Sequence, residues 1–191
     1  MHRFIWDMRY DPIQGMTSES EANAVPHRTY FAATAPFAPP GTYTVRLTTG
    51  GTTSTQPLKL VLDPRVKTSS AAMTRISTLS REMYDDAAAA HSAYVDARAM
   101  SDKVTDATLK AAIDSIAPPP AQGPRRGFGG PPQGVSAPTL QSIQSTLLAA
   151  AMSMQNADVG VTARQVDAVE KARAQFKDVM MRWSALSKKA H

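Results

Sequence analysis

The sequence contains no cysteine among its 191 residues, and aromatic residues make up only 6% of it. Without cysteine there can be no disulfide and no cysteine-ligated zinc or iron–sulfur centre, so the fold must rely on packing alone. No apolar run approaches the roughly 20 residues that a membrane-spanning helix needs. We therefore expect neither a membrane span nor a covalent cross-link.

The N-terminus lacks the pattern of an export signal. Asp7 comes too early for the apolar core of a signal peptide, and no small-residue cleavage site is evident in the first residues. We expect no signal peptide on this chain.

The net charge of +5 is spread thinly over the sequence. Binding of nucleic acid calls for basic side chains clustered on one face, with aromatic residues between them to stack on bases. No segment has that composition. We therefore expect that nucleic acid is not a partner.

The N-terminal third predicts β-structure. Residues 3–10 alternate in the manner of a half-buried strand, and residues 42–48 alternate again. Gly50-Gly51 can take the positive φ angles of a tight hairpin turn, and the return strand ends before Pro64. Residues 11–38 are expected to be mainly loop, with a short strand at 28–31. The strands present one apolar face, which consists of Phe4, Trp6, Tyr43, Val45, Leu47, Leu58 and Leu60.

The composition becomes helical from Thr68 onward, where Thr68, Ser69 or Ser70 can cap a first helix. Apolar residues recur every three or four positions to about residue 117, which predicts one long helix. This pattern weakens over residues 101–105, where the helix could break. A second helix is expected over 138–156, and Thr162 caps a third that runs to about 188. The turn between the last two is so short that they must pack antiparallel.

These patterns predict an α+β protein with two parts. Residues 1–66 are expected to form a partial antiparallel immunoglobulin-like β-sandwich, and residues 67–191 an antiparallel three-helix bundle. Residues 117–137 are rich in proline and glycine, which can neither continue a helix nor bury a core, so they are expected to be a flexible linker.

Residues that could perform chemistry are sparse. The four histidines have no partner at the spacing of a metal site, and Asp85-Asp86 diverge by about 100° on a helix. The glycine-rich run 127–130 has neither the strand nor the lysine of a phosphate-binding loop. We expect no catalytic residue, metal or cofactor. The candidate interface residues are Phe4, Trp6, Tyr43 and Trp183, of which Trp183 is also expected to close the core of the bundle.

Several motifs together resemble the C-terminal region of bacterial sortilin-like, BNR-repeat β-propeller proteins, which are often labelled glycosyl hydrolases. The strand motifs also resemble the immunoglobulin-like domain of flagellar hook-capping proteins. The resemblance is carried by residues 3–10, 40–47, 56–58, 63–66, 157–162 and 182–183. It implies a secreted or periplasmic parent protein with a β-propeller upstream. No catalytic residue carries over, because the propeller itself is not part of this sequence.

The function that we expect is a non-catalytic C-terminal accessory module that interacts with a β-propeller or another protein. Two alternatives remain open at this point. The chain could be a fragment of a glycoside hydrolase, with Asp7 or Asp63 lining the active site. It could also be a stand-alone module that oligomerises through its helices. The sequence does not fix the oligomeric state.

Overall fold

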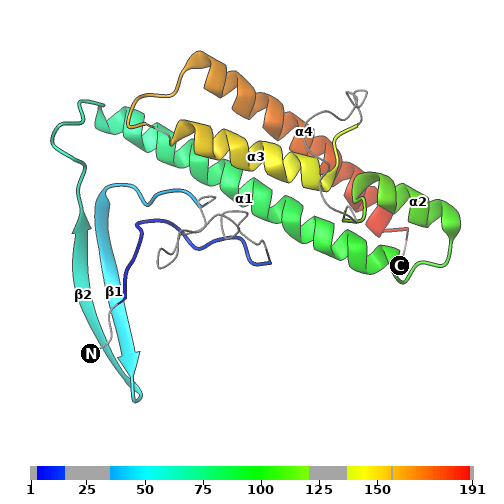
Figure 1. The fold of residues 1–191 in the computed structure, drawn as a ribbon, viewed down its shortest axis with the longest axis horizontal. Coiled ribbons are helices and arrows are strands. Elements are labelled where there is room, and N and C mark those ends of the chain that lie inside the picture. The colour runs from blue at the N-terminus through cyan, green and yellow to red at the C-terminus, as the bar shows by residue number, and fades with distance from the viewer. Residues whose placement is uncertain (1–3, 16–34, 121–136, 156, 190–191) are drawn as a thin grey trace, which may run out of the picture.

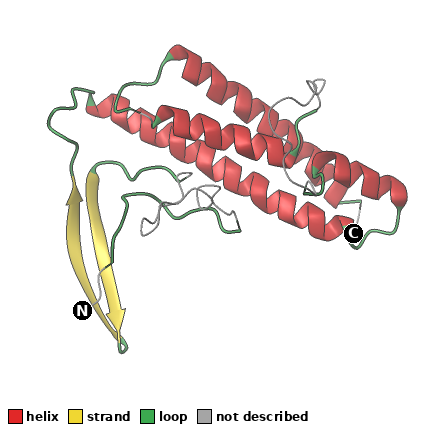
Figure 2. Cartoon of the chain, viewed as in Figure 1, coloured by secondary structure: helices red, strands yellow, loops and turns green. Residues whose placement is uncertain are grey.

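The computed structural model describes residues 4–15, 35–120, 137–155 and 157–189. It shows an α+β protein with one two-stranded antiparallel sheet and four helices (Figures 1 and 2). The predicted mixed class is confirmed, whereas neither the β-sandwich nor the three-helix bundle is confirmed. The elements are β1 (Gly41–Thr49), β2 (Thr52–Leu60), α1 (Ser70–Ser101), α2 (Ala107–Ile116), α3 (Leu140–Met154) and α4 (Ala163–Ser187).

The predicted hairpin forms from β1 and β2, which pair in register from Gly41↔Leu60 to Thr49↔Thr52. Its turn is Gly50-Gly51, with φ angles of 54° and 79° that favour glycine. Residues directly opposite one another in an antiparallel pair lie on the same face of the sheet. Tyr43, Val45, Leu47, Leu58 and Leu60 therefore share one face, as predicted.

The strand predicted over residues 3–10 is wrong for the part that the structure describes. Residues 4–10 are irregular apart from an isolated antiparallel bridge between Arg9 and Phe37. Met8 has a φ of 62°, which turns the chain out of the extended conformation. The short strand expected at 28–31 lies outside the described residues, as does most of the expected linker at 117–137.

Each helix begins at a capping residue. Ser69 caps α1, and Thr162 caps α4 through a capping box with Gln165. The weak stretch predicted near residue 103 is a real break, because α1 ends at Ser101 and Asp106 caps a separate α2. The interval from 68 to 117 therefore contains two helices.

The three long helices lie side by side, with α1 and α3 antiparallel (Figure 1). Ser80 Oγ donates to the carbonyl oxygen of Ala151 at 3.4 Å, and His91 Nδ1 lies 3.3 Å from Gln144 Oε1. Helix α4 also contacts α1, and Arg173 of α4 forms an ion pair with Glu82 of α1 at 2.9 Å.

The second half of α1 contributes small residues to the core, whereas its first half contributes Ile76, Met83 and Tyr84. Four buried alanines, at positions 87, 90, 93 and 97, follow one another along α1. Buried Leu140, Ile143, Leu147 and Ala151 on α3 share this core cluster with Val179 and Trp183 from α4. The small alanine side chains leave room for the neighbouring helices, α3 among them, to approach α1 closely.

Enlarging one of these alanines should destabilise the fold. Ala90 is fully buried, so Ala90→Leu must force its neighbours apart and should lower the free energy of unfolding by about 1–3 kcal/mol. Ala89→Leu is the matched control, because Ala89 is exposed on the next position of the same helix and its enlargement should be nearly neutral. Urea unfolding measures both, and equal effects would contradict the close packing of α1 on α3.

Candidate functional site

The hairpin projects away from the helices (Figure 1), and apolar side chains on one of its faces are exposed. Val45 is 51% exposed, Leu47 64% and Leu58 39%. An isolated two-stranded hairpin is at best marginally stable in water, and its apolar residues need a second layer to cover them. The described residues place no such layer over Val45 and Leu47. This exposed face is therefore the first candidate site.

At the base of the hairpin, residues 4–11 and 35–40 form a segment that we call the strap. The Trp6 ring meets the Tyr43 ring edge-on, with centroids 5.6 Å apart, and Trp6 Nε1 donates to the carbonyl oxygen of Arg9 at 2.9 Å. The Arg9 guanidinium lies 3.6 Å above the centre of the Phe37 ring and donates to the carbonyl oxygen of Ala35 at 2.6 Å. Burial of this guanidinium lowers the pKa of Arg9, although nearby Asp7 opposes the shift.

The strap continues to the helices. Tyr84 of α1 donates its hydroxyl to the carbonyl oxygen of Asp11 at 2.7 Å. On α1 as well, the Arg81 guanidinium lies 4.3 Å above the centre of the Tyr10 ring. Gln155, just after α3, accepts the backbone N–H of Phe37 at 3.0 Å. The hairpin is thus held to α1 and the end of α3 by contacts at its base.

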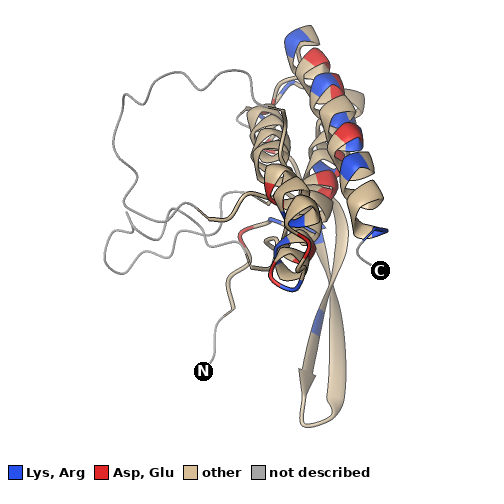
Figure 3. Cartoon of the chain, turned by 90° about the vertical axis from the view of Figure 1, so that its right-hand side faces the viewer, with Lys and Arg blue, Asp and Glu red and all other residues tan. Residues whose placement is uncertain are grey.

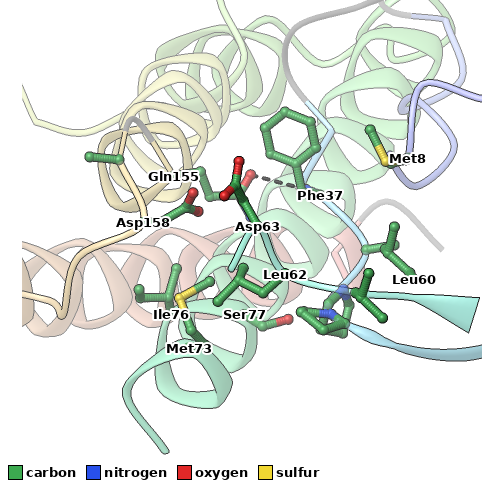
Figure 4. A pocket seen from close by; sticks show the side chains of 15 residues that line it. Met8, Phe37, Leu60, Leu62, Asp63, Met73, Ile76, Ser77, Gln155 and Asp158 are labelled. Atoms are coloured by element: carbon green, nitrogen blue, oxygen red, sulfur yellow. Dashed lines mark hydrogen bonds between the residues drawn. The ribbon is translucent and has the colours of Figure 1, made fainter. Parts of the chain in front are cut away.

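A cavity of about 360 Å³ opens where the strap, the end of β2 and the helices meet, and we call it the joint pocket (Figure 4). The side chains that line it are mainly apolar, with Asp63, Ser77, Gln155 and Asp158 as polar exceptions. Its apolar lining includes Met8, Phe37, Leu60, Leu62, Met73 and Ile76. An apolar hollow with a few polar groups can bind an apolar or amphipathic side chain.

Asp63 has the wrong environment for acid catalysis. Its carboxylate forms a bidentate pair with the Arg65 side chain at 2.7–3.2 Å and accepts the Arg65 backbone N–H at 2.8 Å. These hydrogen bonds, the side-chain ones first, lower the pKa of Asp63. A general acid in glycoside hydrolysis needs a raised pKa. Asp7 does not line the joint pocket, and its carboxylate accepts the Arg9 backbone N–H at 3.1 Å.

The four predicted interface residues lie in different surroundings. Trp6 and Tyr43 are brought together at the base of the hairpin. Phe4 is 90% exposed, whereas Trp183 is only 9% exposed and belongs to the helical core. The sequence analysis missed Arg9, Phe37 and the joint pocket, because those contacts join segments far apart in the chain and no local pattern marks them.

Two further findings concern the described residues only. They contain no group of three histidine, aspartate or glutamate side chains positioned to hold a metal ion. None of the helices described is long and apolar enough to cross a membrane. Comparison with models of protein families, with curated proteins and with solved structures gives no match.

The environment of Asp63 can be tested by carboxyl NMR titration. We expect Asp63 to titrate below the ordinary aspartate pKa of about 3.9, because the Arg65 guanidinium stabilises its charged form. Arg65→Ala should raise the pKa toward that value, only partly, since the backbone N–H remains. Lys67→Ala is the control and should leave the pKa of Asp63 unchanged, because Lys67 Nζ hydrogen-bonds the carbonyl oxygen of Pro64 instead. A pKa above the ordinary value would contradict the pairing.

Proposed function

We propose that this chain is a non-catalytic accessory module of a secreted, hydrolase-like β-propeller protein, and that it binds a β-rich partner through its hairpin. The single observation that carries the proposal is the exposed apolar face of the hairpin, on which Val45, Leu47 and Leu58 have no covering layer among the described residues. A large apolar surface on a projecting element is typical of an interface.

A β-rich partner fits this face because sheets pack well on sheets. Side chains from two apolar sheet faces interdigitate at a separation of about 10 Å. In this proposal the hairpin belongs to an immunoglobulin-like sandwich whose other strands come from elsewhere. The β part of the chain ends at about residue 66, and the helical part follows it. The long helices α1, α3 and α4 act as an antiparallel three-helix bundle that supports the hairpin, with α2 as an addition at its end.

The resemblance to the C-terminal region of BNR-repeat proteins supports a β-propeller as the partner. The strand motifs of that resemblance, at residues 40–47 and 56–58, fall on β1 and β2. The exposed apolar face is thus made by the segments that carry the resemblance. Propeller blades are four-stranded sheets and so offer β-structure of the required kind.

The proposal predicts that charge on the hairpin face weakens binding to the propeller. The measurement is the Kd between the purified chain and a β-propeller domain encoded in the same reading frame or an adjacent one. Val45→Lys and Leu47→Lys should each weaken binding by at least about tenfold, because a buried charge replaces an apolar contact.

Met181→Lys is the matched control for these variants. Met181 is also an exposed apolar residue, at 66% exposure, but it lies on α4 and should tolerate the charge without loss of binding. Equal losses for the α4 and hairpin variants would show that the face is not specific. Absence of any binding to the propeller by the unaltered chain would overturn the proposed function.

A further inference from the structure

We infer that the outer edge of β1 is a strand-addition site, and that it binds an extended, acidic segment of the partner polypeptide. This inference rests on the proposed function, because it specifies how a β-rich partner engages the hairpin. It differs from face-to-face packing, since the contact is made by backbone hydrogen bonds along one edge of the sheet.

The register determines which backbone groups point outward. Opposite residues in an antiparallel ladder alternate between hydrogen-bonded pairs and pairs whose N–H and C=O groups point away from the partner strand. A two-residue turn is closed by a hydrogen-bonded pair, here Thr49↔Thr52. Counting back from this pair, Arg46↔Thr55 and Thr44↔Pro57 are non-hydrogen-bonded pairs, whose backbone N–H and C=O groups point away from the partner strand.

The two edges of the hairpin therefore differ. The outer edge of β1 presents the N–H and C=O groups of Thr42, Thr44, Arg46 and Thr48 without interruption. The outer edge of β2 contains Pro57, which has no N–H, and Lys59. Proline and lysine on an edge strand both hinder the addition of another strand. Pairing of another strand along β2 is therefore hindered, whereas the edge of β1 remains able to pair with one.

The edge of β1 is unoccupied by any segment that the structure describes. No backbone hydrogen bond in those residues joins it to a third strand, and β1 and β2 are the whole sheet. The nearby residues 4–7 reach the hairpin through the Trp6 ring on Tyr43. The Trp6–Arg9 and Asp7–Arg9 hydrogen bonds hold that segment in a turn, which is incompatible with pairing along β1.

Charge favours an acidic partner over a second copy of this chain. Arg46 and Lys59 are the charged residues of positions 41–60, and both are basic. Figure 3 accordingly shows basic and no acidic positions along the hairpin. Two copies joined at β1 would bring like charges together on one four-stranded sheet. A strand with a carboxylate opposite Arg46 gains a cross-strand pair instead.

The side-chain faces specify the partner further. Arg46 shares its face of β1 with Thr42, Thr44 and Thr48, whereas Tyr43, Val45 and Leu47 lie on the other. A strand that continues both faces must alternate acidic or polar residues with apolar ones. Such a segment would also extend the apolar face over which the proposed sheet packing occurs.

The test uses a synthetic peptide of alternating valine and glutamate, with a valine–lysine peptide as the charge control. Amide hydrogen exchange followed by NMR reports each edge separately. The acidic peptide should slow exchange of the Thr44 and Arg46 N–H groups by at least about tenfold and leave that of Thr55 on β2 unchanged. The basic peptide should protect neither edge.

Two proline variants form a matched pair. Thr44→Pro removes an outward N–H from β1 and should abolish the protection of Arg46 by the peptide. Thr55→Pro removes the equivalent outward N–H from β2 and should leave the protection of Arg46 by the peptide unchanged. The inward N–H groups of Val45 and Leu47 should stay protected in both variants, which shows that the hairpin persists. If they lose protection, Arg46→Glu replaces Thr44→Pro and should shift the preference to the basic peptide.

Several outcomes would overturn the inference. Protection of Thr55 equal to that of Thr44, or equal binding of both peptides, would show that the edge of β1 is not selective. Protection of Thr44 in the chain alone at every concentration would mean that another segment of this chain pairs there. Protection that rises with concentration, together with a doubled mass, would identify a second copy as the occupant.

The same variants separate this inference from the proposed function. If Thr44→Pro binds the β-propeller as well as the unaltered chain while Val45→Lys does not, the edge site is wrong and the proposed function stands. If the acidic peptide protects Thr44 but no β-propeller binds, the proposed function is wrong and the edge site stands.

Discussion

Along α1, four buried alanines let the neighbouring helices approach closely, and α1 packs on α2, α3 and α4. α4 adds to this packing through Val179, Trp183 and the Arg173–Glu82 ion pair. The strap reaches these helices through Tyr84 on α1 and Gln155 just after α3. Because cores packed from small residues tolerate little change of volume, the position of the hairpin is set by a rigid support.

In contrast to the buried helical core, the hairpin exposes apolar residues that the helices do not cover. Val45 and Leu47 lie beyond the strap, whereas Tyr43 at the base is held by Trp6. Near that base, hydrogen bonds from Arg65 lower the pKa of Asp63, whereas a general acid needs a raised one. An exposed face, an edge of β1 that no described segment pairs with, and an apolar joint pocket lie on or beside one projecting element. This arrangement supports the proposal of an interaction module.

Sequence reasoning succeeded where the structure follows from neighbouring residues. The turn at Gly50-Gly51, the caps at Ser69 and Thr162 and the break after Ser101 all depend on local conformational preferences. It failed for residues 4–10, whose alternation predicted a strand. There Met8 turns the backbone, and Arg9 leaves the strand pattern to contact Phe37 and Ala35. Those partners are more than 25 residues away, so their influence is invisible in a local pattern.

The sequence by itself determined the α+β class, the hairpin with its apolar face, and the ends of the helices, because periodicity, turns and caps act over a few residues. Only the tertiary structure decided that the N-terminal segment is a strap and that a pocket lies at the base of the hairpin. These features depend on which distant segments meet. The exposure of Val45 and Leu47 was also decided by the tertiary structure, because the burial of a face depends on what covers it as well as on its composition.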